Sequence, residues 1–145
     1  MSVLGRSAAR ALFAAGRVAR LATVDAEGRP HLVPIVFVVD GETIYSAVDG
    51  KPKRTTELRR LANVVANPVV SVLVDHYDDD DWTALRWARA DGAGRVLPPE
   101  HPQARAAVDL LVAKYRQHAR ERPAGPVLAV DVTRWSGWAA AEPMG

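Results

Sequence analysis

The stretch RLATVDAEGRPHLVPIVFVVDGETIYSAV, residues 20–48, holds three runs of β-branched and aromatic residues separated by two turn signals. The first signal centres on Gly28, and the second is Asp40-Gly41, a dipeptide typical of tight hairpins. We expect strands over residues 17–25, 31–39 and 42–48, joined as an antiparallel meander. Pro34 lies inside the second run, and because proline cannot donate to a strand ladder it indicates an edge, a bulge or a gap that faces a ligand.

The rest of the chain adds helices and further strands around this meander. Apolar spacing predicts helices over residues 4–15, 55–63 and from about 102 to Pro123, and Gly16 follows the first as a C′ residue would. Strands are expected over residues 69–75, 81–97 and 127–138, the second kinked near Gly92 and Gly94. The order lacks the strand–helix alternation of a parallel sheet. It predicts a mainly β, α+β fold, with an antiparallel barrel, closed or partly closed, and helices at its ends.

Length and composition limit the possible classes. The chain has 145 residues and a net charge of +2, which predicts one domain over residues 1–145 and gives no general preference for nucleic acid. It has no cysteine, which excludes disulfides and is compatible with a cytoplasmic location. No apolar run approaches the ~20 residues that cross a membrane, and the N-terminal stretch carries arginines where a signal peptide would be apolar. We therefore expect a cytoplasmic protein without a membrane partner.

A basic stretch follows the third expected strand. Lys51, Lys53 and Arg54 stand directly before Thr55, where a helix is expected to begin. Free backbone N–H groups, hydroxyls and cations at such a place can hold a phosphate. A solvated basic loop with a threonine cap explains the same residues, so both interpretations remain open. Because no aromatic residue is interleaved among these cations, a nucleic-acid surface is not expected.

No side chain stands out as a nucleophile, a general base or a metal ligand set. The acidic stretch DHYDDDDW, residues 75–82, lacks the glycine and terminal glutamate of a calcium loop, and the histidines are scattered. We expect no metal, the catalytic residues are unknown, and any redox chemistry is expected to belong to a bound cofactor. Four tryptophans, Trp82, Trp87, Trp135 and Trp138, suit either core or interface packing or an aromatic wall beside a planar cofactor.

Several motifs together resemble a known superfamily. They are the hairpin with Gly28, Pro30 and Pro34 in a G-x-P-x-x-x-P pattern, the GKPKR end of the third strand, the NPVVSVLVD entry and the strand DWTALRWARADGAG. Their order is similar to that of the split β-barrel flavin and deazaflavin enzymes, which include the pyridoxamine-phosphate-oxidase-like proteins. Within that superfamily the chain most resembles the actinobacterial branch that uses the deazaflavin coenzyme F420. The resemblance implies an FMN-binding type of split barrel with about six strands.

The resemblance also implies where a cofactor lies. The ring is expected beside Pro34, Ile35, Val36, Ser46 and Ala47. The phosphate is expected on the basic stretch, Lys51, Lys53, Arg54 and Thr55. A homodimer with two sites between its subunits is implied, with Trp82, Trp87 or Trp135 of the partner subunit closing each site.

The function implied is hydride transfer between reduced F420 and an electron-poor small molecule. Alternatives are an FMN-dependent oxidoreductase of the same fold, a protein that carries F420 without turnover, and a haem-handling protein. The tail of F420 favours a wide basic groove, which Arg59, Arg60, Arg86 and Arg89 would form if they faced one another.

Overall fold

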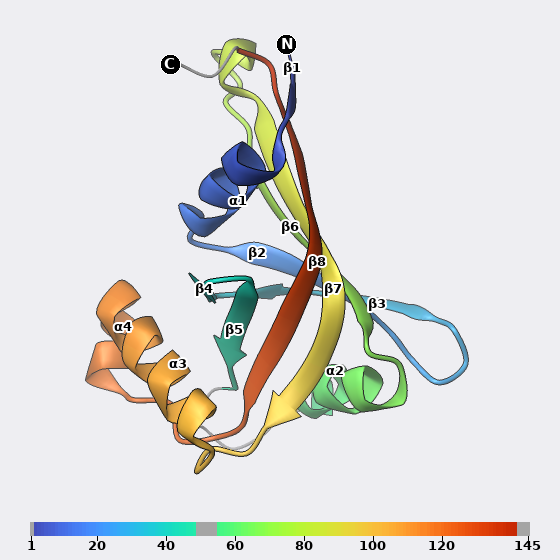
Figure 1. Ribbon diagram of the computed structural model, residues 1–145, viewed down its shortest axis with the longest axis vertical. Coiled ribbons are helices and arrows are strands. Elements are labelled where there is room, and N and C mark those ends of the chain that lie inside the picture. Colours follow the sequence, from blue (N-terminus) through green and yellow to red (C-terminus); the bar gives the residue numbers. More distant parts are fainter. Residues whose placement is uncertain (1, 49–54, 142–145) are drawn as a thin grey trace.

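The computed structural model describes residues 2–48 and 55–141, except for the side chains of residues 55–58. In this part of the chain the strands are β1 (Ser2–Leu4), β2 (Ala19–Val24), β3 (Pro30–Ile35), β4 (Val38–Asp40), β5 (Thr43–Ala47), β6 (Val69–His76), β7 (Arg86–Leu97) and β8 (Val127–Ala139). The helices are α1 (Arg6–Ala14), α2 (Thr55–Ala66), α3 (Pro102–Lys114) and α4 (Arg116–Arg120), with a 3₁₀ turn, η1, at Trp82–Ala84. The described strands form one antiparallel sheet in the order β3-β2-β6-β7-β8-β5-β4, and β1 pairs with β8 (Figure 1). The predicted α+β class with an antiparallel sheet and flanking helices is confirmed.

The long strands β7 and β8 form the spine of the sheet and bend together (Figure 1). Their register shifts between Asp91 and Gly92, which is where the sequence predicted a kink. A Cβ atom on Gly92 would lie 2.2 Å from the carbonyl oxygen of Asp131 on β8. Only glycine therefore permits the close approach of the two backbones at this bend.

The predicted meander is wrong, because the second expected strand is two strands. β3 pairs with β2 and β4 pairs with β5, but Val36 and Phe37 interrupt the run between them, and β5 pairs next with β8. The physical reason lies at Phe37. Its side chain is fully buried, and the Tyr115 hydroxyl accepts from its N–H at 3.1 Å and donates to its carbonyl oxygen at 2.9 Å. Pro34 lies on β3, at one end of the strand order, as an edge position requires.

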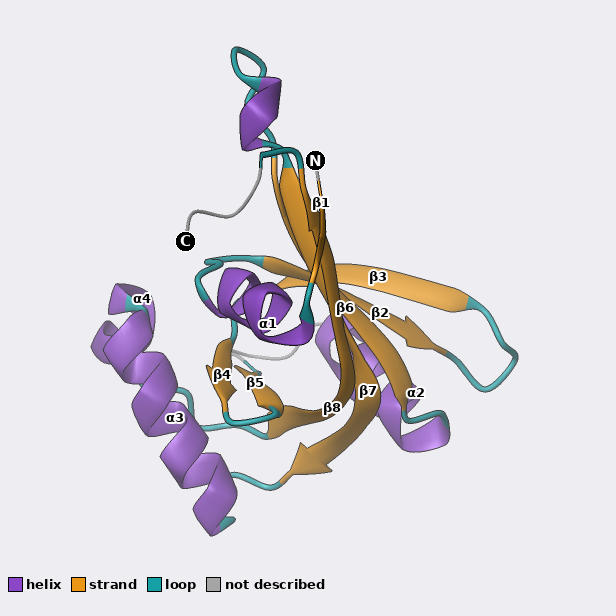
Figure 2. Ribbon diagram, turned by 45° about the horizontal axis from the view of Figure 1, so that its top comes forward, coloured by secondary structure: helices purple, strands orange, loops and turns teal. Residues whose placement is uncertain are grey.

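Helix α1 packs on the inner face of the sheet (Figure 2). Its Phe13 meets Phe37 and Trp135, with ring centroids 5.0 and 5.4 Å apart, at the centre of the main core. Gly16 follows the C-cap residue Ala15, at the C′ position predicted for it, but without the positive φ of a left-handed cap. Its small size matters instead, because a Cβ there would lie 2.7 Å from Val74 Cγ1 on β6.

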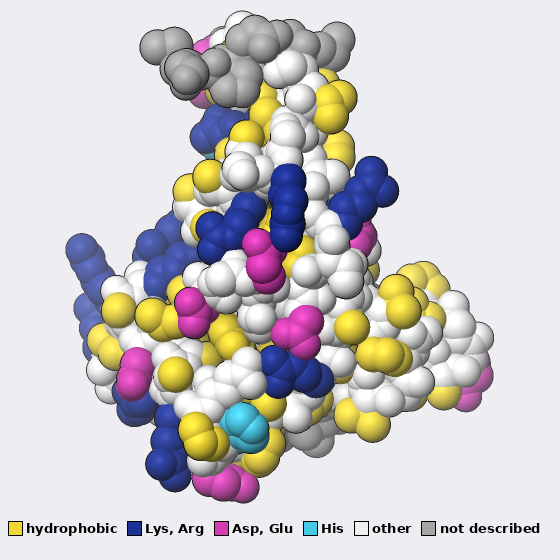
Figure 3. Space-filling view, in the orientation of Figure 1, with side chains coloured by type: hydrophobic (Ala, Val, Ile, Leu, Met, Phe, Trp, Pro, Cys, Tyr) yellow, Lys and Arg dark blue, Asp and Glu magenta, His cyan; other side chains and the backbone are white. Residues whose placement is uncertain are grey.

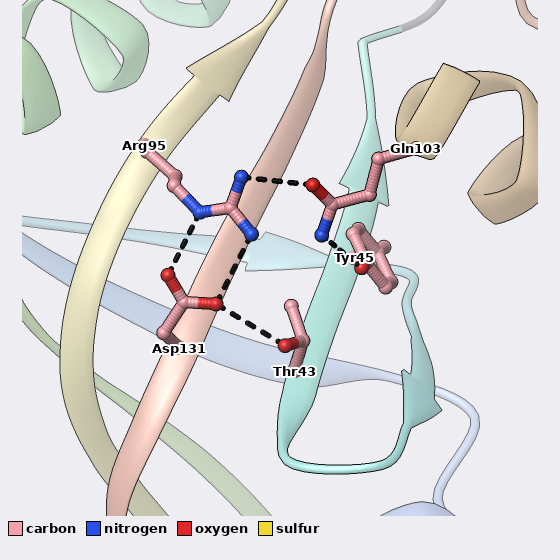
Figure 4. Close-up of polar contacts among 5 residues, drawn as sticks. All are labelled: Thr43, Tyr45, Arg95, Gln103 and Asp131. Carbon is pink, nitrogen blue, oxygen red and sulfur yellow. Dashed lines mark hydrogen bonds and ion pairs between the residues drawn. The ribbon is translucent and has the colours of Figure 1, made fainter. Parts of the chain in front are cut away.

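Helices α3 and α4 lie on one side of the sheet, over β4 and β5, while α2 lies on the other (Figure 2). The sequence predicted one helix here, but the chain breaks at Tyr115, whose extended backbone separates α3 from α4. A polar network holds α3 in place (Figure 4). Arg95 on β7 donates to Asp131 and to Gln103 on α3, and Gln103 donates to the Tyr45 hydroxyl at 2.6 Å. No described helix is long and apolar enough to span a membrane.

Candidate functional site

The five residues expected beside a cofactor ring line a single pocket. Pro34 and Ile35 come from the end of β3, Val36 follows directly, and Ser46 and Ala47 come from the end of β5. The two strands are not neighbours in the sheet order, so this pocket occupies the split between them. We call it the strand-edge pocket. Its volume is about 190 Å³.

Four further residues, which the sequence did not assign to this pocket, complete its lining. They are Arg60 of α2, Gln117 and His118 of α4, and Glu121 after α4. The His118 ring meets the Tyr115 ring edge to face at 5.7 Å, so the tyrosine that breaks α3 from α4 also supports this wall. No local signal marks these residues, because only the tertiary packing of α2 and α4 brings them to the strand ends.

The strand-edge pocket has an apolar side and a polar side. Its strand side is mostly apolar, and Ser46, which is buried, adds a hydroxyl. Its helix side offers a guanidinium, an amide, an imidazole and a carboxylate. Apolar walls with a few polar groups are typical of small-molecule sites. At about 190 Å³ the pocket is smaller than the roughly 300–1,000 Å³ that is typical of small-molecule sites.

The basic stretch expected to hold a phosphate lies mostly outside the described residues. Lys51, Lys53 and Arg54 belong to the gap at residues 49–54, and the Thr55 side chain is not described. The structure does show that α2 begins at Thr55, where the sequence predicted a helix. In the sequence the three cations therefore directly precede a 12-residue helix, and the N-terminus of a helix favours anions.

The tryptophans differ in what they offer to a ligand. Trp135 is 4% exposed, packs against Phe13 and donates from Nε1 to Glu42 at 2.6 Å, so it is a core residue with almost no surface free for a cofactor. Trp82 in η1 is 65% exposed, and Trp87 on β7 is half-buried beneath the Arg89 guanidinium, 5.8 Å from the ring centre. Neither lines the strand-edge pocket of this chain.

The arginines proposed for one wide groove do not meet within a chain. Arg60 lines the strand-edge pocket, Arg59 lines an open hollow between α2 and the β2–β3 turn, and Arg86 lines a third pocket beside α1. Arg89 pairs with Asp91 at 3.1 Å. The groove expected from these four residues is therefore absent from the described part of a single chain. The same part of the chain holds no group of three or more His, Asp or Glu residues arranged to bind a metal.

Comparison with known proteins identifies the family. The model of the pyridoxamine 5'-phosphate oxidase family matches residues 6–139, nearly the whole chain. The chain belongs to this family. It is a family of flavin-binding oxidoreductases, and its match covers both halves of the strand-edge pocket and the basic stretch. The expectation of a pyridoxamine-phosphate-oxidase-like split barrel is thereby confirmed.

Individual relatives agree with this family. A curated relative is the 5a,11a-dehydrotetracycline/5a,11a-dehydrooxytetracycline reductase of Streptomyces rimosus, 34% identical over 79 residues; these cover 54% of each chain, so the match spans about half of that protein. A FAD-binding protein from Mesorhizobium loti superposes with a TM-score of 0.71 at 21% identity, covering 94% of this chain and 95% of its own. The heme storage protein HutZ from Vibrio cholerae superposes at 0.69 and 15% identity, covering 92% of each chain. These two solved structures show the shared fold.

Proposed function

We propose that this protein is an F420-dependent oxidoreductase, which transfers a hydride between the reduced deazaflavin and an electron-poor small molecule. The observation that carries the proposal is the strand-edge pocket, which gathers all five residues expected beside the cofactor ring. The family is one of flavin-binding oxidoreductases, and the curated relative is named as a reductase. Both support a redox role over a purely structural one.

The residues of the pocket fit a deazaflavin or flavin ring. When bound, such a cofactor supplies the hydride chemistry, so the protein needs to bind, orient and shield the reactants rather than provide a nucleophile. Pro34, Ile35 and Val36 present apolar surface to the ring and keep water from it. Ser46 and the Arg60 guanidinium supply donors for polar atoms at its edge. Lys51, Lys53, Arg54 and Thr55 are proposed to bind the phosphate ahead of α2.

The proposal includes a cytoplasmic homodimer, with each site completed by the partner subunit. The small volume of the strand-edge pocket supports this, because a ligand of cofactor size needs further walls. So does the outer face of the sheet, where Leu32 on β3 and Val69 on β6 are each 67% exposed. Exposed apolar side chains on a sheet face are typical of an interface. Trp82 and Trp87 remain proposed contacts from the partner side.

FMN in the same pocket is the second candidate. It is favoured by the family and by the solved structure named as FAD-binding. Both cofactors carry a phosphate on a polyol-type chain, so the basic stretch serves either. A carrier that binds F420 without turnover would use the same residues.

Two measurements separate these candidates. Purified protein is titrated with F420 and, separately, with FMN, while tryptophan fluorescence is followed. The proposal expects F420 to bind more tightly, and much tighter FMN binding would favour the second candidate. Oxidation of reduced F420 is then followed after addition of electron-poor acceptors. Binding without oxidation by any acceptor would indicate a carrier.

A further inference from the structure

A second pocket, separate from the strand-edge pocket, lies where the C-terminal end of α1 meets β2, β6 and β7. We call it the arginine pocket, and its lining is Leu12, Ala15, Gly16, Arg17, Val18, Arg20, Val74, Asp75, His76 and Arg86. The two pockets share no residue. Its volume of about 340 Å³ lies within the range of small-molecule sites, roughly 300–1,000 Å³.

The pocket carries an excess of positive charge. Arg17, Arg20 and Arg86 come from three segments, the turn after α1, β2 and β7. Asp75 is the one acid among the described lining residues, and His76 stands beside it. Lys and Arg side chains are also prominent over α1 in the space-filling view (Figure 3). An anion entering here would meet the guanidinium groups of Arg20 and Arg86 and a single carboxylate. The Arg17 guanidinium lies over the Tyr115 ring, 4.9 Å from its centre, and Tyr115 does not line the pocket.

Arg20 and Arg86 keep donors for a ligand. Arg20 faces Asp75 at 3.7 Å with both side chains about half exposed, which is a weak, screened pair. Arg86 donates from Nη1 to the Ala84 carbonyl at 2.7 Å, and Arg17 from Nη2 to the Lys114 carbonyl at 2.9 Å. Because a guanidinium has five N–H donors, the bond to Ala84 orients Arg86 without exhausting it, while the bond to Lys114 holds the Arg17 guanidinium toward the end of α3.

The nearby acidic stretch does not neutralise the pocket. Residues 78–81 follow β6, but none of them lines the pocket. Three of their four carboxylates are engaged locally: Asp78 accepts from the Asp80 N–H, Asp79 from the Tyr77 hydroxyl, and Asp81 from the Thr83 N–H.

The wall opposite the charges is apolar. Leu12 of α1, Ala15 directly after this helix, Val18 and Val74 of β6 supply its apolar lining. Gly16 permits the close approach of this segment to β6, because a Cβ there would approach Val74 Cγ1 to 2.7 Å. The pocket thus pairs an apolar wall with a cationic rim, the complement of a molecule with an apolar body and an anionic group.

We propose that the arginine pocket binds a small organic anion, a carboxylate, sulfonate or phosphate carried on an apolar body. The proposal does not depend on the identity of the redox cofactor, because no residue of the strand-edge pocket takes part.

A pair of fluorescent probes tests it. The sulfonate 1-anilinonaphthalene-8-sulfonate is titrated into the full chain, and N-phenyl-1-naphthylamine, the same ring system without the sulfonate, is titrated in parallel. We expect one sulfonate site per chain and at least about tenfold weaker binding of the uncharged probe, in line with loss of charge-assisted hydrogen bonds. Equal affinities for the two probes would overturn the proposal.

Variants locate the binding. Arg20→Met with Arg86→Met is expected to weaken binding of the sulfonate at least about tenfold, while Arg105→Met, which removes an exposed charge of α3, leaves it unchanged. If the double variant does not fold, Ala15→Phe fills the pocket from the exposed C-cap position of α1 and is expected to abolish the signal. Affinity within twofold of wild type in the folded double variant, or in Ala15→Phe, would contradict the assignment.

Discussion

The ammonium nitrogen of Lys114 lies 4.0 Å from the centre of the Phe37 ring, and it makes no hydrogen bond to any described residue. Burial, helped by the neighbouring Arg17 charge, lowers the pKa of Lys114 from 10.5 to about 8. The ring contact favours the charged form, but it does not offset the loss of water around the ammonium. The buried charge of Lys114, at the C-terminal end of α3 and beside Phe37, therefore lowers the stability of the folded protein.

Replacing Lys114 with methionine is expected to stabilise the protein at pH 7. The lowered folded-state pKa means that the unfolded chain binds more protons between pH 8 and 10.5, so wild-type stability rises with pH across that window. The gain in Lys114→Met is about 1 kcal/mol at pH 7, after allowance for the solvent that still screens this half-buried group. It should disappear above pH 10.5. Urea unfolding from pH 7 to 11 measures this, and a variant less stable than wild type at pH 7 would contradict it.

The pair formed by Arg95 and Asp131 acts in the opposite pH range. Hydrogen bonds from Arg95 lower the pKa of Asp131 below its ordinary 3.8. Stability from this carboxylate is therefore present above pH 3.8 and lost as pH falls through the lowered folded-state value. Asp131→Asn is expected to lower the free energy of unfolding by about 1 kcal/mol at pH 7. The variant should also lose less stability than wild type as the pH falls below 3.8. Thermal unfolding between pH 2 and 7 tests both expectations. If wild type and variant lose the same stability at acid pH, the pair does not contribute.

A methyl group at Gly92 should be poorly tolerated. Because its Cβ would lie 2.2 Å from the Asp131 carbonyl oxygen, Gly92→Ala must separate β7 from β8 at their bend, and we expect a loss of about 2 kcal/mol or more. Gly5→Ala is the control, since a Cβ there meets nothing within 4 Å; because Gly5 is the N-cap of α1, a loss of at most about 1 kcal/mol is expected. Similar stability of the two variants in chemical unfolding would show that the bend relaxes freely.

Local signals predicted much of this fold. Asp40-Gly41 marked the β4–β5 hairpin, with Gly41 at a φ of 61°, and the continuous apolar run at 69–75 marked β6, which lies inside the sheet. The break at Val36 and Phe37 could not be predicted, because β-branched residues continue through it and its cause, the Tyr115 hydroxyl, is 78 residues away. The break of the last helix at Tyr115 was missed for the same reason, since both depend on one tertiary contact.

The candidate site was predictable only on its strand side. Pro34, Ile35 and Val36 followed from the resemblance to a family, and the structure brings them together with Ser46 and Ala47. The helix side, including His118, depends on where α4 docks, which no spacing in the sequence encodes. Trp135 was misleading because a tryptophan near a strand end suits a core and a ligand wall equally well; its burial decides for the core.

The proposed homodimer makes a further prediction. Leu32 is 67% exposed on the outer face of β3, so replacing it with glutamate should cost a monomer little. If that face is the subunit interface, Leu32→Glu should convert a dimer to a monomer in light scattering coupled to size exclusion. Leu110→Glu on α3 is the control and should remain dimeric. A dimeric Leu32→Glu variant, or a monomeric wild type at tens of micromolar, would contradict the proposed interface.

The most direct test of the central claim is cofactor titration of Val36→Glu against Val3→Glu. Val36 lines the strand-edge pocket, whereas Val3 is 84% exposed and lies far from it. Val3 pairs with Trp138 on β8, while the pocket residue Ser46 pairs with Leu128, ten residues away on the same strand. A carboxylate in the apolar wall should oppose both the ring and the anionic cofactor, so Val36→Glu is expected to weaken binding of F420, or of FMN if that is the cofactor, at least about tenfold. Val3→Glu should bind as wild type does. Unchanged affinity in a folded Val36→Glu variant would show that the cofactor ring binds elsewhere.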